Sequence, residues 1–542
     1  MSSWPNDSGF DTDYEELAPV ALTVKGTIPK YAAGVLYRTG PLGYKVKTDD
    51  GKIWAANHWF DGISCVHRFQ IDFLNEDGPA HVTYRSRRTV DEFLEIVRST
   101  GRLDGLTFAA KRDPCKSFFK KVMGIFYPAK NGNNIGVTLS INMPGDTIER
   151  EDSADINGHT TGVDTLHVKT DANMIKRIDP ETLEPQGVVN QTVLHPDLNG
   201  PLSASHAKMD PDTGDLFNYN LQFGRGATYR IFRTSAATGK TDILATFPAK
   251  PAYIHSLFLS KNHVVLCIWN SHITWGGISV LYNRNLVDAI APFDPSLKAT
   301  WYVIDRTHGK GLVATYESMP FFAFHTINAW EEPSASDSTK TDILCELSMY
   351  ENTDLIHRFF YDNLLSSNEA TNAYAGKKRE SCLPMQAQFR LPSVDSSVSS
   401  SQPLPVELVF KADKMLSTEL PTINPRYATK RHRFVYGTTD RLKSSFTDGL
   451  AKFDNITQKS IFWETEGHTP GEAVFIADPQ GQKEDDGVLL SVVLDGFKEK
   501  SYLLVLDARD LTEMGRAEMQ GPMAFGFHGA YKAGKMAYRI DT

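Results

Sequence analysis

The sequence predicts an all-β chain that closes into a propeller. Short apolar segments alternate with turns along nearly the whole length, a hydrophobic residue followed by Asp and a turn recurs many times, and helical material is minor. Many hairpins spread over 542 residues indicate an all-β fold, and a β-propeller is the natural closed arrangement for a weak repeat of this length. The repeat is degenerate, so it leaves the number of blades open.

The recurring unit places Asp at the start of each turn. An Asp side chain stabilises a turn by accepting hydrogen bonds from the backbone two residues further on, and Gly supplies positive φ. The unit occurs at residues 178–182, 209–214, 304–309, 453–457 and 506–509. Strand-like runs lie between these turns, at residues 216–223, 229–233, 263–269, 488–494 and 502–506.

The remaining elements are few. Residues 354–365 predict one helix with Asp354 as its N-cap. The Ser-rich residues 393–402 and the stretch 332–338 are expected to be surface excursions, too short to link domains. We therefore expect a single domain over residues 1–542, with residues 1–20 polar and loosely held.

Composition excludes several classes of protein. Hydrophobic residues make up 41% and aromatic residues 11%, which is ample for a core. The formal net charge of −9, with no basic stripe, argues against a nucleic-acid partner. Five scattered cysteines without CxxC spacing indicate a reducing, cytoplasmic compartment. We find no signal peptide and no apolar stretch long enough to span a membrane.

Residues 107–130 combine lysines with bulky apolar side chains. Such a segment can lie in a membrane interface, and Cys115 beside it is a candidate for acylation. The alternative is an ordinary amphipathic surface helix. The residues that would share the apolar face are Phe118, Phe119, Val122, Met123, Ile125 and Phe126, with charge from Lys116, Lys120 and Lys121.

An aromatic pair stands in the turn-rich stretch His58-Trp59-Phe60-Asp61-Gly62. We interpret this stretch as a buried loop corner, with direct substrate contact as the alternative.

One histidine lies in the middle of the aromatic run at residues 321–332. Imidazole is a neutral ligand for a transition metal, and an apolar shell keeps water from competing. Taken alone, His325 is better explained as a core histidine. Three further histidines occur in comparable settings, at His206, His255 and His528.

The four histidines match no local metal motif, because they lie far apart along the chain. This spacing is what a propeller requires if each of four blades sends one ligand from an inner strand to a common axis. A set of imidazoles with open positions suits Fe(II) or zinc.

Three carboxylates flank apolar runs, where an unpaired charge is costly. Metal-bound histidines usually donate their other N–H to a carboxylate. The candidates are Asp171, Glu419 and Glu472, and the alternative for each is a loop carboxylate in water.

In their order along the chain, these segments resemble the carotenoid cleavage oxygenase family, which includes the retinal pigment epithelium isomerohydrolase and fungal apocarotenoid-forming dioxygenases. The resemblance runs from about residue 22 to the last strand. The segments that carry it are Trp59-Phe60-Asp61-Gly62, Ser205-His206-Ala207-Lys208-Met209-Asp210, His255-Ser256, His325 with Asn328-Ala329-Trp330-Glu331, Pro470-Gly471-Glu472 and Phe527-His528-Gly529.

The resemblance implies a seven-bladed propeller with a helical cap and one Fe(II) per subunit on its axis. It implies His206, His255, His325 and His528 as iron ligands, with Glu419 and Glu472 behind them. The third family glutamate falls on Asp171, so we expect this shorter side chain to need water or a backbone shift to reach its histidine. Thr170 matches a family threonine beside the open iron position, and residues 109–127 resemble the family's membrane-dipping segment.

The implied activity is cleavage of one C=C bond of a carotenoid or apocarotenoid, such as β-carotene or torulene, with O2 to give aldehydes. The implied setting is cytoplasmic with peripheral membrane contact. The first alternative is a stilbene-cleaving dioxygenase; that branch carries a lysine directly before the carboxylate, where this chain has Thr170 and places Lys169 one step further back. Isomerohydrolase chemistry on a retinyl ester and a non-catalytic lipid-binding propeller are lower-ranked alternatives.

Overall fold

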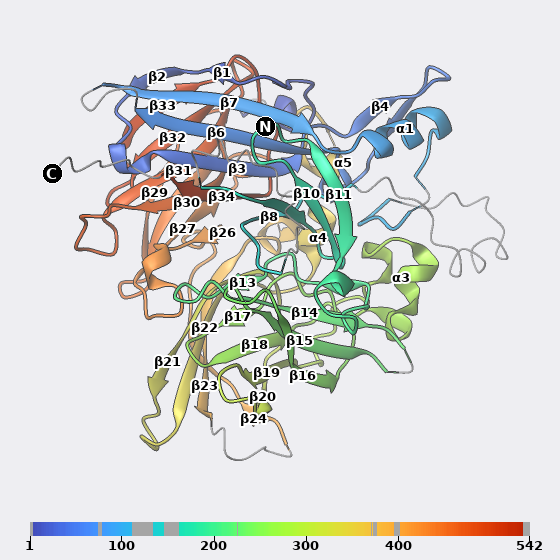
Figure 1. Ribbon diagram of the computed structural model, residues 1–542, viewed down its shortest axis with the longest axis vertical. Coiled ribbons are helices and arrows are strands. Elements are labelled where there is room, and N and C mark those ends of the chain that lie inside the picture. Colours follow the sequence, from blue (N-terminus) through green and yellow to red (C-terminus); the bar gives the residue numbers. More distant parts are fainter. Residues whose placement is uncertain are drawn as a thin grey trace.

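Seven sheets of four or five strands form the blades of a propeller (Figure 1). The structure is a computed structural model that describes residues 4–73, 78–103, 105–110, 134–145, 162–224, 226–369, 371, 377–394 and 402–534. The prediction of an all-β propeller is confirmed, and the blade number is the seven implied by the family resemblance.

Three blades carry the N-terminal half of the chain. The first contains β1 (Val20–Ala21), β7 (Ala80–Arg88), β6 (Ser64–Phe73), β3 (Gly34–Pro41) and β34 (His528–Ala533). The second contains β11 (Pro185–Asn190), β10 (Met174–Ile178), β9 (Leu166–Lys169) and β8 (Thr138–Ile141). The third contains β12 (Leu202–Ser203), β14 (Leu216–Gln222), β15 (Thr228–Thr234) and β16 (Thr241–Pro248), with β13 (Lys208–Met209) also paired to β14.

The other four blades follow in chain order. The fourth contains β17 (Phe258–Leu259), β18 (His263–Ile268), β19 (Ala299–Asp305), β20 (Gly311–Ser318) and β24 (Leu404–Pro405). The fifth contains β21 (Phe322–Pro333), β22 (Thr341–Tyr350), β23 (Met385–Val394) and β25 (Glu407–Lys411). The sixth contains β26 (Glu419–Thr422), β27 (Phe434–Thr439), β28 (Gly449–Asp454) and β29 (Lys459–Trp463). The seventh contains β30 (His468–Ala477), β31 (Gly487–Asp495), β32 (Lys500–Asp507), β33 (Glu513–Glu518) and β2 (Thr23–Gly26). A separate hairpin joins β4 (Lys45–Lys47) to β5 (Ile53–Ala55).

The predicted Asp turns form as expected. Asp179 accepts hydrogen bonds from the backbone N–H of Glu181 and Thr182, at 2.9 and 2.7 Å. Asp210 does the same for Asp212 and Thr213. The five predicted strand runs coincide with β14, β15, β18, β31 and β32 to within a residue or two at each end, which is the usual uncertainty of strand boundaries.

The two ends of the described chain close the ring. Strand β34 pairs antiparallel with β3, with Thr39 opposite His528, so first and last strands share one blade. Figure 1 shows the blue β3 beside β34. Strand β2 likewise pairs with β33. These pairings hold the first and last parts of the described chain together within two blades.

Helices and the loops beside them contribute to the wall of the central cavity, through Leu103, Val280, Leu355 and Arg358. The α-helices of the described residues are α1 (Asp91–Thr100), α3 (Ile278–Asn283), α4 (Asp354–Arg358), α5 (Tyr361–Leu364) and α7 (Lys377–Glu380). The prediction of one helix over residues 354–365 is wrong in detail. Phe360 adopts extended backbone and bridges to His58, which splits the segment into α4 and α5. Thr353, not Asp354, occupies the N-cap position.

The expectation that residues 1–20 are loosely held is wrong for Trp4, Asn6 and Phe10, which anchor the segment. Trp4, Asn6 and Phe10 are buried. Phe10 packs edge-on against Phe525 with ring centroids 4.9 Å apart, and the Asn6 side chain donates to the Ser445 hydroxyl at 2.7 Å. The polar composition of the segment gave no sign of these contacts, which attach it to two distant parts of the chain, at Ser445 and Phe525.

Most of the predicted membrane-interface segment lies outside the described residues. Of residues 107–130, the structure describes only 107–110, so Cys115, Phe118, Phe119, Ile125 and Phe126 are not described. Among the described helices, none is both long enough and apolar enough to cross a membrane.

Candidate metal centre

Four imidazoles meet near the centre of the propeller. One nitrogen from each of His206, His255, His325 and His528 lies within 4.8 Å of the others. The Nε2 atoms of His206 and His528 are 2.9 Å apart, and those of His325 and His528 are 3.3 Å apart. The predicted convergence of these four residues is confirmed.

The four histidines come from segments at the inner edge of four blades. His325 lies within β21, and His528 is the first residue of β34. His206 lies between β12 and β13, and His255 precedes β17; a bridge between His206 and Ser256 joins these two segments. Two of the four predicted inner-strand positions are therefore irregular backbone rather than strand.

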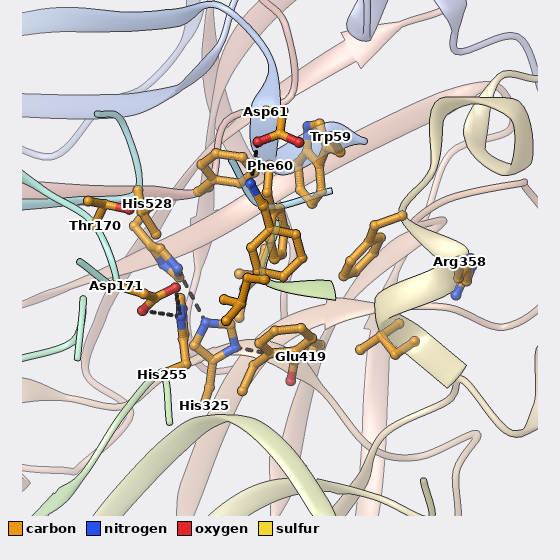
Figure 2. Close-up of a pocket in the computed structure, with 18 of the residues that line it drawn as sticks. Trp59, Phe60, Asp61, Thr170, Asp171, His255, His325, Arg358, Glu419 and His528 are labelled. Carbon is orange, nitrogen blue, oxygen red and sulfur yellow. Dashed lines mark hydrogen bonds and ion pairs between the residues drawn. The ribbon is translucent and has the colours of Figure 1, made fainter. Parts of the chain in front are cut away.

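Each of three rings is held by a carboxylate through its Nδ1 atom. His325 donates to Glu419 at 2.7 Å and His528 to Glu472 at 2.8 Å. His255 donates to Asp171, with Nδ1 2.8 and 2.9 Å from the two carboxylate oxygens. Such hydrogen bonds fix the tautomer and leave Nε2 free to bind a metal. Figure 2 shows two of these pairs, His255 with Asp171 and His325 with Glu419.

The contact of Asp171 is direct. We expected Asp171 to need water or a shift of the backbone to reach its histidine. Water is not needed, because both carboxylate oxygens lie within hydrogen-bond distance of His255 Nδ1. The Asp171 carbonyl also accepts from the Ser203 N–H at 2.9 Å. This hydrogen bond joins the backbone of Asp171 to β12 of the next blade.

Glu472 has a cation as a second partner. The Arg38 guanidinium donates to Glu472 Oε2 at 2.6 Å, and both side chains are largely buried. Burial raises the pKa of the Glu472 carboxyl, but His528 and Arg38 outweigh this and hold the pKa below its ordinary value. The carboxylate is therefore charged at neutral pH.

His206, His325 and His528 have lowered pKa values, which favours the neutral form that binds metals. Burial lowers the pKa of His325 to about 4; Glu419 opposes this shift, and the neighbouring imidazoles add to it. Burial, followed by the other three histidines, holds the pKa of His206 well below its usual range. Four imidazole nitrogen donors are a set that suits Fe(II) or zinc.

Three of the histidines, His255, His325 and His528, line one wall of a cavity of about 180 Å³, and His206 lies next to His528. The lining is mainly apolar and aromatic, and Thr170, Asp171, His255, His325, Glu419 and His528 contribute the polar side near the metal centre. In Figure 2, Arg358 lies across the cavity from the histidines. The apolar lining residues include Trp59, Phe60, Leu103, Leu106, Phe108, Val280, Leu286, Phe324, Phe359 and Phe527.

The stretch at residues 58–62 is a buried corner, as interpreted, and it also lines this cavity. Its Trp59 and Phe60 are part of the wall. Asp61 accepts from the backbone N–H of Phe108 and Ala109, at 2.7 and 2.8 Å. Burial raises the pKa of Asp61 to about 6, although these N–H groups oppose the shift. The corner therefore holds the loop that brings Phe108 to the cavity.

Sequence reasoning missed two polar side chains at the centre, Tyr253 and Ser205. Both donate hydrogen bonds to Asp171. Their proximity to histidines in the sequence, at His255 and His206, was the available signal.

Lysine is absent from the cavity wall within the described part of the chain. Lys169 is buried but lines a separate, smaller cavity behind Thr170. The side chain that would hold a phenol oxygen in a stilbene-cleaving enzyme thus has no counterpart here.

Comparisons with known proteins identify the family of this chain. The family described as retinal pigment epithelial membrane protein matches residues 9–533. A carotenoid dioxygenase of Neurospora crassa is 42% identical, covering 99% of this chain and 93% of the relative. A torulene dioxygenase of Gibberella fujikuroi is also 42% identical, covering 98% of this chain and 94% of the relative.

Solved structures show the same fold. A cobalt-substituted apocarotenoid oxygenase (ACO) of Synechocystis aligns with a TM-score of 0.71 at 18% identity, covering 98% of each chain. An ACO/RPE65 chimera aligns with a TM-score of 0.70, also at 18% identity and 98% coverage of each chain.

Proposed function

We propose that this chain, which belongs to the RPE65/carotenoid oxygenase family, is a dioxygenase. It would cleave a C=C bond of a carotenoid or apocarotenoid with O2 to give aldehydes. The observation that carries the proposal is the convergence of four imidazoles beside an apolar cavity, three of them in its wall. The names of the relatives, carotenoid dioxygenase and torulene dioxygenase, support the substrate class.

The proposed metal ligands are His206, His255, His325 and His528, with one Fe(II) per subunit. Two imidazole nitrogens that bind one ion at about 2.1 Å and at right angles lie about 3.0 Å apart, and the 2.9 and 3.3 Å separations fit this arrangement. When bound, Fe(II) supplies the capacity to activate O2, chemistry that no side chain provides.

The protein's own contribution is position and surroundings. Asp171, Glu419 and Glu472 are proposed to orient the ligand rings. Phe60, Phe108 and Phe324 provide an apolar wall that would hold a rigid polyene and exclude water. Thr170 lines the cavity beside Asp171 and is proposed to border the open face of the metal, where it would limit which atoms approach.

Contact with a membrane surface is part of the proposal, because a polyene substrate resides in lipid. Trp275 and Ile278 are 65% and 47% exposed. They lie in η5 (Thr274–Gly277) and α3, the segment whose Val280 lines the cavity. Exposed Trp and Ile at the outer side of a cavity wall suit a lipid interface. This support is independent of residues 107–130.

Liposome flotation tests the membrane contact. We expect Trp275→Ala with Ile278→Ala to reduce the bound fraction several-fold. Phe497→Ala is the matched control, because Phe497 is 60% exposed in the turn between β31 and β32. Equal loss with the control variant would rule out a specific patch.

A single domain and a cytoplasmic setting complete the proposal. The shared blade of β3 and β34 supports one domain over the chain. Cys65, Cys267, Cys345 and Cys382 are buried thiols that form no disulfide with one another, which supports a reducing compartment.

Aerobic incubation of the Fe(II)-loaded protein with β-carotene, torulene, an apocarotenal and resveratrol tests the activity. We expect aldehyde products from one or more polyenes, identified by chromatography and mass spectrometry. Aldehydes from resveratrol alone would overturn the substrate class in favour of a stilbene dioxygenase. The lack of any product, with iron bound, would favour a non-catalytic propeller.

A further inference from the structure

Asp171 is the shortest of the three carboxylates behind the histidines. A side chain with one methylene fewer than Glu is shorter by about 1.5 Å, the length of one C–C bond. Its carboxylate nevertheless lies against His255 Nδ1 through both oxygens. Something other than reach must therefore keep it there.

Hydroxyl groups hold the Asp171 carboxylate. The Tyr253 hydroxyl donates to Oδ2 at 2.8 Å. The Ser205 backbone N–H donates to Oδ1 at 3.1 Å, and the Ser205 hydroxyl donates to the same oxygen. All three residues are buried. Among the described residues, no arginine or lysine forms an ion pair with Asp171, in contrast to Glu472 with its Arg38.

The tethered carboxylate is connected to two histidines rather than one. It contacts His255 directly, and Ser205 immediately precedes His206. The backbone N–H of His206 also donates to the His255 carbonyl at 3.2 Å. Among the described residues, His206 is in no ion pair with a carboxylate, so its placement depends on this backbone network.

Tyr253 also contacts the cavity wall. Its ring centroid lies 5.6 Å from that of Phe108 and 6.2 Å from that of Phe324, and both phenylalanines line the cavity. The ring is thus packed against the proposed substrate wall, while the hydroxyl points to the carboxylate.

We propose that Tyr253 is a positioning residue of the metal centre: its hydroxyl holds Asp171 in the rotamer that orients His255 directly and His206 through Ser205. The tether replaces the reach that a glutamate would supply. This inference rests on the proposed function, since it assumes that the four histidines bind a metal.

Co(II) binding to the Tyr253→Phe variant tests the tether, since Co(II) reports both affinity and ligand geometry through its visible absorption. The variant keeps the packed ring and loses only the O–H. We expect Co(II) to bind 10- to 100-fold more weakly, the range found when partners behind metal ligands are removed, with an altered spectrum. Tyr316→Phe is the matched control, because Tyr316 is buried and donates to the Pro392 carbonyl at 2.8 Å, away from the site.

A rescue variant separates positioning from a structural role. In Tyr253→Phe with Asp171→Glu, the longer carboxylate should reach His255 without the tether and recover Co(II) affinity. Should Tyr253→Phe not fold, Ser205→Ala provides the same measurement on the other hydroxyl, with weaker Co(II) binding expected.

Three results would overturn the inference. They are wild-type affinity and spectrum in Tyr253→Phe, the same in Ser205→Ala where that variant is used, or a double variant that binds as weakly as Tyr253→Phe. If wild-type protein binds no Co(II), the proposed metal centre itself fails, and the inference fails with it. The wild-type titration therefore distinguishes the two failures.

Discussion

Strand β21 carries members of two histidine–carboxylate pairs with different roles. His325 donates to Glu419 at 2.7 Å, and Glu331 accepts from His263 at 3.0 Å. All four side chains are mostly buried. The Nε2 atom of His325 faces other imidazoles, whereas that of His263 is buried without a hydrogen-bond partner in the described structure. A carboxylate orients a ring in both places, but only the convergence of free nitrogens makes a metal centre.

The carboxylates differ as well. Glu331 is saturated, because it accepts from the Ser260 hydroxyl at 2.6 Å and from the backbone and side chain of Asn262, both at 2.7 Å. Glu419 Oε2 is buried and makes no hydrogen bond of good geometry among the described residues, although the Tyr350 hydroxyl is a polar neighbour of this carboxylate. The hydrogen bonds of the His263–Glu331 pair thus stabilise the fold, whereas Glu419 in the His325 pair can accept a further hydrogen bond.

Replacing His325 or His263 by alanine should separate metal binding from fold stability most strongly. We expect His325→Ala to lose bound iron and polyene cleavage together, because one of four ligands is missing. We expect His263→Ala to keep iron and to unfold more easily, since buried Glu331 loses a donor at a cost of about 1–3 kcal/mol. Metal analysis, product assays and urea unfolding measure both. Turnover retained by His325→Ala would refute the ligand assignment.

Acid should affect the His263 pair next most strongly. Burial raises the pKa of Glu331, but the His263, Ser260 and Asn262 hydrogen bonds outweigh it and lower the pKa from 4.5 to about 2. A lowered carboxyl pKa stabilises the folded state above pH 4.5, and this stability is lost as pH falls towards 2. The shift corresponds to about 3 kcal/mol. Unfolding of metal-free protein against pH should show this loss, and Glu331→Gln should flatten it.

Removing the metal also distinguishes the role of His325 from that of His263. A metal at 100 times its Kd stabilises the fold by about 2.7 kcal/mol. Chelation should therefore lower the Tm of wild-type protein and of His263→Ala, and leave that of His325→Ala unchanged. A chelator-dependent shift in His325→Ala would mean that the ion binds elsewhere.

Glutamine in place of each carboxylate should give the smallest effect. We expect Glu419→Gln to weaken metal binding by about 10- to 100-fold with little change in unfolding, because the replaced oxygen makes no hydrogen bond of good geometry among the described residues. Glu331→Gln should leave metal affinity unchanged and cost about 1–2 kcal/mol of stability. Titration with Co(II) and urea unfolding distinguish them, and a reversal of the two patterns would break the comparison.

Local chemistry made much of the fold predictable. The turn aspartates, such as Asp179 and Asp210, bond to nearby backbone, so short sequence windows contained the signal. The split of residues 354–365 and the anchoring of Trp4 and Phe10 depend on contacts hundreds of residues away. No local pattern encodes such contacts, and these predictions were wrong.

The meeting of the four histidines could be predicted only through the family resemblance. His263 and His255 both have a carboxylate at Nδ1 and buried surroundings, so neither composition nor neighbours in sequence distinguish them. Tyr253 was missed for the same reason, because its partner Asp171 is 82 residues away. The departure at Asp171 was visible in the sequence, and its direct contact was not.

The pairing of β34 with β3 has a consequence for the order of assembly. His528 is at once the first residue of the strand that seals the ring and a member of the metal set. A growing polypeptide holds the other three histidines long before it holds this one. On the proposed ligand set, capture of the ion by all four histidines therefore has to wait until β34 pairs with β3.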